Sequence, residues 1–448
     1  MTLTLRLSTL ALCLLALPSA HPQTAPADDP KVAALINQAA QLTAARKFEE
    51  AHRKLDEAKA LNPHQTFLWS NYAFLSAVSG KLDEAAQNLE HEITEHPDEQ
   101  NAYMQLAQIQ VEQHKPKDAI HTLDRLIARA PTNQQALDTR ATTLLNDKQY
   151  AEAEKALRAI LATHPDSVQA QLLLATTLSH EEKKPEATAL LKSIVQKNND
   201  PGTLNNAAYT LADEELDIPL AEQTARRALT TFEQQSTAIA FDPKPLISAE
   251  ILVSLWDTLG FALLQQGKAA QAEPWLRGAW TNSLGAESGY HLGMALEKLN
   301  QPAKALAIYE LAKFGDGGGD PALVADRIAT REQALRKAGT PVQVADGKAA
   351  LMAQHSFRLP GPNNLTGIAT IQVELSTTGA SNPIIVKDAP NQSNLTPVET
   401  ALYRLDYKVT IPPGTRARLA RRGLLVCHAG APCQLGLFST RGALADAQ

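Results

Sequence analysis

The sequence predicts a mostly α-helical chain of about eight helix–turn–helix units, followed by a small α+β domain. Three observations support this fold class. Prolines, alanines and leucines recur at one fixed interval over residues 39–191. Aromatic residues make up only 5% of the chain, which favours helices packed closely through small side chains. From about residue 359 onward, alternating apolar and polar residues replace the helical pattern, as expected for strands.

The fixed interval is 34 residues, and four interleaved series keep it without a slip. Their members are Pro63, Pro97, Pro131 and Pro165; Ala39, Ala73, Ala107, Ala141 and Ala175; Ala51, Ala85, Ala119, Ala153 and Ala187; and Leu55, Leu89, Leu123, Leu157 and Leu191. Small alanines allow two antiparallel helices to approach closely, and the leucine fills the groove between them. The proline ends the second helix because it lacks an amide donor and clashes with the preceding turn. The period therefore indicates a tandem array of helix pairs.

These positions resemble the pattern of the tetratricopeptide repeat (TPR) family, W-x2-L-G-x2-Y followed by A-x3-F and P. The segment from Trp256 to Gly260, with Ala272 and Leu276, matches the opening motif best. The resemblance implies an α-solenoid over about residues 31–338. Its expected parts are units 1–5 at 31–200, units 6–8 at 201–338 with an insertion at 231–250, and a capping helix from Pro321 to Lys337.

The resemblance also implies that the first helices of the units line a concave face that binds a protein or peptide. The candidate partner-binding residues are Phe67, Phe74, Asn101, Met104, Gln108, Asp138, Leu172, Asn205, Tyr209, Asp257, Phe261 and Tyr290. This set has no Lys or Arg to clamp a terminal carboxylate, so an extended or helical segment is the expected ligand. The alternative is that Phe67, Phe74 and Phe261 only pack between neighbouring first helices.

The C-terminal part is expected to be a small domain at residues 359–442, in the order strand, strand, helix, strand, strand, after a linker at 339–358. The first strand places Ala369, Ile371, Val373 and Leu375 on one face. Cys427 and Cys433 are separated by five residues in the final hairpin. In an oxidising compartment they are expected to form a disulfide; the alternative is a pair of buried thiols.

Three segments of this domain resemble the C-terminal domain of TonB proteins. They are the opening strand and turn (Gly367 to Gly379), the helix from Leu395 to Leu405, and the strand from Arg421 to Cys427. TonB proteins also carry an N-terminal membrane anchor and a Pro-rich spacer, which this sequence does not show. The resemblance therefore implies a binding or assembly module rather than energy coupling.

Positive charge gathers in the same domain, at Arg416, Arg418, Arg421 and Arg422. One interpretation is contact with an anionic envelope surface. The other is a charged edge strand that prevents edge-to-edge pairing.

The first twenty residues have the features of a secretory signal peptide. Arg6 supplies the positive charge, Leu10 to Leu17 is apolar, and Ala20 or Ala27 offers a small residue for cleavage. The apolar stretch is shorter than the roughly 20 residues that span a bilayer, and no later segment is a transmembrane candidate. The sequence therefore predicts an exported protein, periplasmic or extracellular.

No pattern for catalysis, metal binding or a cofactor is found, and the protein is not expected to be an enzyme. HExxH, CxxC, G-x-S-x-G and P-loop motifs are missing from the sequence. A net charge of −6 with no concentrated basic face argues against nucleic acid. The expected function is an exported scaffold that holds a protein partner on its concave face. The alternative is an auxiliary subunit of a cell-envelope machine for secretion, cell-wall synthesis or outer-membrane assembly, acting through the C-terminal domain.

Overall fold

The computed structural model describes residues 29–236, 245–315, 321–341, 346–359, 366–376, 379–387, 396–416 and 419–438. The chain divides between Glu182 and Lys183 into two compact units. The N-terminal unit comprises residues 29–182 and the C-terminal unit residues 183–438 of the described chain. The predicted signal peptide at 1–20, with both cleavage sites, lies outside the described residues.

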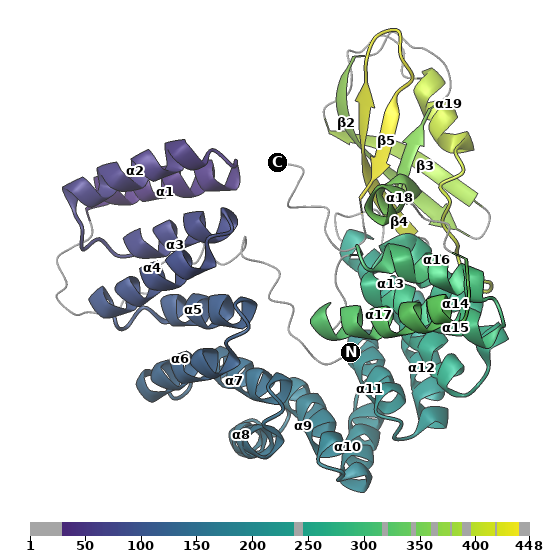
Figure 1. The fold of residues 1–448 in the computed structure, drawn as a ribbon, viewed down its shortest axis with the longest axis horizontal. Helices are drawn as coiled ribbons and strands as arrows, with labels where there is room; N and C mark the ends of the chain where they lie inside the picture. Colours follow the sequence, from purple (N-terminus) through teal and green to yellow (C-terminus); the bar gives the residue numbers. More distant parts are fainter. Residues whose placement is uncertain are drawn as a thin grey trace. The chain divides into compact units, whose positions relative to one another are not determined.

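The N-terminal unit consists of antiparallel helix pairs in chain order (Figure 1). Its helices are α1 (Pro30–Ala44), α2 (Phe48–Leu61), α3 (Leu68–Val78), α4 (Leu82–Glu95), α5 (Gln100–Glu112), α6 (Pro116–Arg129), α7 (Gln134–Asn146), α8 (Tyr150–Thr163) and α9 (Val168–His180). Each helix packs against the next, as a helical repeat requires. Helix α10 (Lys184–Lys197) belongs to the C-terminal unit, so the division falls inside the predicted units 1–5 (31–200) rather than at residue 200.

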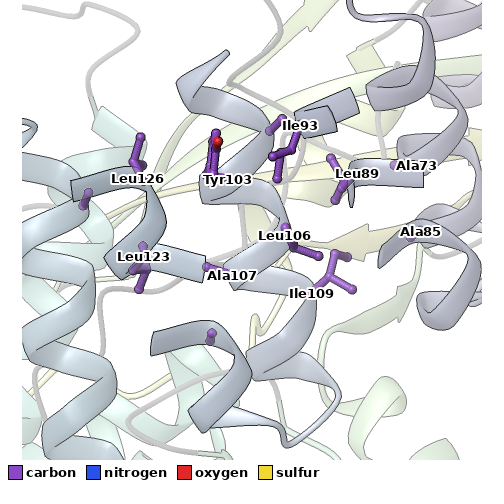
Figure 2. Packing of buried hydrophobic residues seen from close by; sticks show 13 residues of the cluster. Ala73, Ala85, Leu89, Ile93, Tyr103, Leu106, Ala107, Ile109, Leu123 and Leu126 are labelled. Carbon is purple, nitrogen blue, oxygen red and sulfur yellow. The ribbon is translucent and has the colours of Figure 1, made fainter. Parts of the chain in front are cut away.

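The repeated residues form the hydrophobic seam of the stack, as the 34-residue period predicts. All ten alanines of the two series and all five leucines are at most 2% exposed. Figure 2 shows one stretch of this seam, where Leu89 and Ile93 of α4, Leu106 of α5 and Leu123 of α6 gather between three consecutive helices. The repeated prolines lie two residues beyond the ends of α2, α4, α6 and α8.

The turn inside each helix pair contains one residue with a positive φ, and these residues also follow the period. They are Arg46 (57°), Gly80 (77°), His114 (58°), Lys148 (60°) and Glu182 (61°), each 34 residues after the one before. Only one of the five is a glycine, the residue that adopts this conformation without steric cost. The turn is therefore fixed by the helix packing around it rather than by its own residue type.

The helices of the C-terminal unit are α10, α11 (Pro201–Asp213), α12 (Ile218–Ser236), α13 (Pro245–Gln265), α14 (Ala269–Ser283), α15 (Ala286–Lys298), α16 (Pro302–Ala312), α17 (Pro321–Lys337), α18 (Gly347–Gln354) and α19 (Thr396–Arg404). Each helix from α10 to α16 packs against the next. The expected insertion at 231–250 is in part helical, because α12 runs to Ser236 and α13 begins at Pro245. The expected capping helix is α17; it packs against α15 and α16 and buries Ile328.

Five strands form one antiparallel sheet in the order β1-β5-β4-β2-β3. They are β1 (Ser356–Arg358), β2 (Gly367–Ser376), β3 (Gly379–Lys387), β4 (Leu419–Cys427) and β5 (Gln434–Leu437). The predicted core face of β2 is confirmed, since Ala369, Ile371 and Val373 are fully buried and Leu375 is 3% exposed. A disulfide joins Cys427 and Cys433 between β4 and β5.

The sheet differs from the expectation at its first strand. Residues 339–358, predicted to be a linker, contain α18 and β1. Strand β1 is only three residues long and pairs with β5, the last strand of the sheet. A strand this short leaves no periodic signal in the sequence, and its identity depends on its partner strand.

The sheet is attached to the helices of the C-terminal unit by backbone and side-chain hydrogen bonds. In the segment before β4, the backbone N–H of Thr410 donates to Thr281 Oγ1 (2.9 Å) and its carbonyl accepts from Asn282 Nδ2 (3.0 Å). His355 Nε2 lies 2.9 Å from the carbonyl of Thr281. Gly278 allows this approach, because a Cβ there would overlap the ring of Pro412. The sheet and the end of α14 therefore form one packed body.

Candidate partner-binding face

The N-terminal unit exposes a set of side chains along its first helices, which we call the first-helix face. It comprises the predicted residues Phe67, Phe74, Asn101, Met104, Gln108 and Asp138, all exposed or half-exposed. Phe67 precedes α3, and the others lie on α3, α5 and α7. Residues 34 apart, such as Phe67 and Asn101, Met104 and Asp138, or Phe74 and Gln108, occupy equivalent positions on neighbouring first helices. The repeat thus arranges these side chains in parallel rows.

The chemistry of this face is mixed amide, apolar and acidic. Gln108 Nε2 donates to Glu112 Oε1 (2.7 Å), one turn further along α5. Asp138 accepts a hydrogen bond from Gln134 Nε2 (2.8 Å). Partial burial raises the pKa of Asp138, and the bond from Gln134 opposes that rise. Amide groups beside Met104 and Phe74 can bind a peptide backbone and its apolar side chains together.

Phe67 is held at this face by an unusual helix cap. Its backbone has φ of 70°, and its side chain is 42% exposed. The carboxylate of Glu92, in α4, accepts from the backbone N–H groups of Phe67 (2.8 Å), Trp69 (2.9 Å) and Ser70 (3.0 Å). Glu92 is fully buried, and burial raises its pKa while these three N–H groups oppose the rise. A side chain from the second helix of the pair, α4, therefore caps the start of the first helix of the same pair, α3.

Of the six remaining predicted residues, Asp257 and Tyr290 are partly exposed. The other four are buried. Leu172 is 2% exposed, Asn205 4%, Tyr209 1% and Phe261 3%. None of these four can contact a partner without repacking, which corrects their assignment as partner-binding residues. For Tyr209 and Phe261 the physical reason is contact with other side chains: Phe261 stacks on Tyr209 and His291, and the Tyr209 hydroxyl bonds to Glu287.

The residues of the C-terminal unit form an aromatic and acidic cluster centred on His291 of α15. The His291 ring stacks on Phe261 of α13 at 4.2 Å between centroids, and Phe261 stacks on Tyr209 of α11 at 5.5 Å. Phe261 thus packs between neighbouring first helices, as the alternative interpretation states. The Tyr209 hydroxyl donates to Glu287 Oε1 (2.8 Å).

The cluster contains one close pair of a histidine and a carboxylate. His291 Nδ1 lies 2.9 Å from Asp257 Oδ2. Burial acts to lower the pKa of His291, but Asp257 and Glu287 outweigh it, so the pKa is raised. Arg331 of helix α17 packs beside the cluster. It donates to Glu297 Oε1 (3.2 Å), and its guanidinium lies 5.9 Å from the centre of the Tyr290 ring.

Sequence reasoning missed His291 and Glu287 as members of this cluster. A signal was present, because Asp257 and His291 are 34 residues apart, which places His291 one residue past the equivalent of Asp257 in the next unit. The same separation links Glu297 and Arg331. Pairs of opposite charge at one repeat length are therefore candidates for contact.

The four arginines of the C-terminal domain do not form one surface cluster. Arg421 is 1% exposed and donates to Asn282 Oδ1 (3.2 Å) and to the Phe438 carbonyl (2.6 Å). Arg422 donates to Gln372 Oε1 (3.1 Å) across the sheet, and Arg416 is exposed. Arg418 lies outside the described residues. Arg421 was wrong as a surface contact, because its guanidinium joins the sheet to α14.

The described part of the chain contains no group of three or more His, Cys, Asp or Glu side chains arranged to hold a metal ion. Within the same residues, no helix has the length and apolar character needed to cross a membrane.

Comparison with known proteins identifies the repeats. Residues 76–141 and 144–208 match the tetratricopeptide repeat family. The chain therefore contains TPR repeats, and its helices form a TPR solenoid. The match does not reach the C-terminal sheet, and the TonB resemblance of that domain has no support. No curated protein sequence matches the chain.

Solved structures show similar helical repeats at low identity. A tetratricopeptide repeat protein from Parabacteroides merdae is 15% identical, with a TM-score of 0.44, covering 68% of this chain and 99% of that one. Yeast Tom70 is 13% identical with a TM-score of 0.47, covering 71% and 68%. YrrB, described as a TPR protein with an unusual peptide-binding site, is 17% identical with a TM-score of 0.31, covering 40% and 91%.

Proposed function

We propose that the protein is an exported, non-catalytic scaffold that binds a protein or peptide segment on the first-helix face of its N-terminal unit. The observation that carries the proposal is the row arrangement of Phe74, Met104, Gln108 and Asp138. These side chains are half-exposed on consecutive first helices, although the same helices bury Ala73, Ala107 and Ala141. An array of equivalent positions can contact an extended or helical segment at regular intervals.

The proposed ligand is a segment that offers both backbone hydrogen bonds and apolar side chains. The amides of Asn101 and Gln108 can bind the backbone, while Phe74 and Met104 supply apolar contact area. A few such side chains carry most of the binding free energy at typical interfaces. The exported location is part of the proposal and is supported by Arg6 and the apolar stretch from Leu10 to Leu17.

The test compares two variants of equal size with the wild-type chain. Phe74→Ala/Met104→Ala removes two apolar groups from the first-helix face. Lys117→Ala/Lys155→Ala removes two exposed cations from the second helices α6 and α8 and is the matched control. Each chain is purified by affinity from the exported fraction, and bound proteins are quantified by mass spectrometry.

The first variant should lose about tenfold or more of its specific partner, because each removed contact is worth on the order of 1 kcal/mol or more. The control should retain it. Equal recovery with both variants would contradict binding at this face. Tyr209 is not a suitable probe, because its hydroxyl bonds to Glu287 inside the cluster.

The second candidate is an auxiliary subunit of an envelope machine that acts through the C-terminal domain. It is favoured by Ile368 and Tyr403, which are 54% and 51% exposed on that domain. Deleting the domain is a poor test, because the sheet packs on α14. Ile368→Asp/Tyr403→Ala is sharper, and loss of the partner in this variant alone would favour the second candidate.

A further inference from the structure

A pocket opens in the C-terminal unit beside the outer strands of the sheet. Its volume is about 780 Å³. Its walls come from the end of α14, Phe314 after α16, helix α18, and strands β1, β5 and β4. The size lies within the roughly 300–1,000 Å³ typical of small-molecule pockets, so a small ligand suits it better than a folded partner.

Most of the lining is apolar, and part of it is exposed. Phe314 is 47% exposed and Met352 is 66% exposed, and both line the pocket. Leu424 and Val426 are half-exposed on the sheet. Ile368, 54% exposed, pairs with Val426 in the neighbouring strand and extends the apolar surface beyond the pocket. Exposed apolar side chains gathered in a concave site mark a binding surface.

The charge of the lining has one sign. Lys348 and Arg358 line the pocket and are exposed, and none of its lining residues is Asp or Glu. Among the described residues, neither cation forms an ion pair. Behind the wall, the fully buried guanidinium of Arg421 lies 3.4 Å from Nδ1 of His355, a lining residue. Its three hydrogen-bonding neighbours, Asn282, Phe438 and His355, include no carboxylate. The charged groups that line the pocket or lie directly behind it are therefore cationic, which favours an anionic ligand.

We propose that this pocket binds a long-chain carboxylate, with its hydrocarbon chain on the apolar lining and its anionic head at Lys348 and Arg358. An arginine and a lysine suit a single carboxylate, because guanidinium binds both of its oxygens and the ammonium adds charge. The apolar lining, with Phe314, Met352, Leu424 and Val426, suits an unbranched chain. The site lies in the C-terminal unit and is independent of the first-helix face, so failure of one proposal leaves the other standing.

The experiment is isothermal titration of the full chain with decanoate below its micelle concentration. The expected result is saturable binding of one decanoate per chain, with no binding of acetate. Lys348→Gln/Arg358→Gln should weaken binding at least tenfold. Arg404→Gln, which removes an exposed cation from α19 in the same domain, should leave binding unchanged.

Three outcomes would overturn the proposal. They are no saturable binding by the wild-type chain, equal affinity of the double variant, or equal affinity for decanol and decanoate. A lysophospholipid that binds more tightly than decanoate would overturn the choice of a free carboxylate. Circular dichroism of both variants checks that each retains its fold.

Discussion

His291 Nδ1 lies 2.9 Å from Asp257 Oδ2, a contact between the neighbouring first helices α13 and α15. These two units are 33 residues apart, as the turn residues Gly267 and Asn300 show, so His291 stands one residue past the equivalent of Asp257. In the N-terminal unit the repeat arranges equivalent exposed side chains in rows. In the C-terminal unit it places first helices side by side, and their aromatic and charged side chains meet in a buried cluster.

Glu92→Ala should destabilise the N-terminal unit by about 2–4 kcal/mol. The substitution leaves three backbone N–H groups at the start of α3 without their acceptor, and a lost cap or an unpaired buried donor costs about 1–2 kcal/mol. Urea unfolding followed by circular dichroism measures the change. Glu49→Ala, at an exposed position of α2, is the control and should change stability by less than about 0.5 kcal/mol. Equal effects of the two substitutions would refute the cap.

Lys148→Gly should stabilise the chain by about 0.5–1 kcal/mol, although it removes a side chain. Lys148 is exposed and has φ of 60°, a strained conformation that glycine adopts freely. Gly80→Ala is the reverse test at the equivalent position two repeats earlier. A Cβ at Gly80 meets nothing within 4 Å, so its cost of about 1 kcal/mol would arise from the backbone alone. Thermal unfolding of both variants should shift in opposite directions; a shift in the same direction would contradict the prediction.

Gly293→Ala should destabilise the C-terminal unit by about 3 kcal/mol, since overpacking a buried site has this order of cost. A Cβ at this position would overlap the fully buried ring of Tyr309, whose hydroxyl donates to Glu297 (2.6 Å). In a double-mutant cycle with Tyr309→Leu, the two costs should fall short of additivity by about 1 kcal/mol or more. Gly202→Ala, where the nearest atom is Asp200 Oδ2 at 3.3 Å, is the control. Strict additivity would show that the ring is not the obstacle.

The C-terminal unit should lose stability as the pH falls from about 6.5 to 4. Burial, with the positive charge of Arg421, lowers the pKa of His355 to about 4 from the ordinary 6.5. Below pH 6.5 the unfolded chain therefore binds a proton that the folded chain does not, and the folded state loses about 1.4 kcal/mol for each pH unit. The total approaches about 3 kcal/mol at pH 4.

His355→Gln should remove this slope, because glutamine does not titrate. Urea unfolding at pH 7, 5.5 and 4 compares this variant with the wild-type chain. His121→Gln, at an exposed position of α6, should keep the full slope. A His355→Gln slope equal to that of the wild-type chain would place the titrating group elsewhere.

Most of the helical architecture could be predicted because each repeat presents the same residues to the same neighbours. Ala51, Leu55 and their equivalents are buried in every pair, and the predicted strand face of Ala369 to Leu375 is also buried. Exposure on the first helices was less predictable. Met104 and Leu172 stand at equivalent positions, yet Met104 is half-exposed and Leu172 is 2% exposed. Position within a repeat indicates which way a side chain points, but not how closely the surrounding helices cover it.

The sequence by itself determined the repeat, the helix pairs, their buried seam and the hairpin that contains Cys427 and Cys433, since these depend on local pattern and neighbours at a fixed interval. Tertiary structure alone decided that β1 joins β5, that Arg421 is buried against Asn282, and that α18 completes a pocket with the sheet. These contacts join residues tens to more than a hundred positions apart without periodicity. Their free energy depends on desolvation and packing between distant segments, which appear only when the chain is folded.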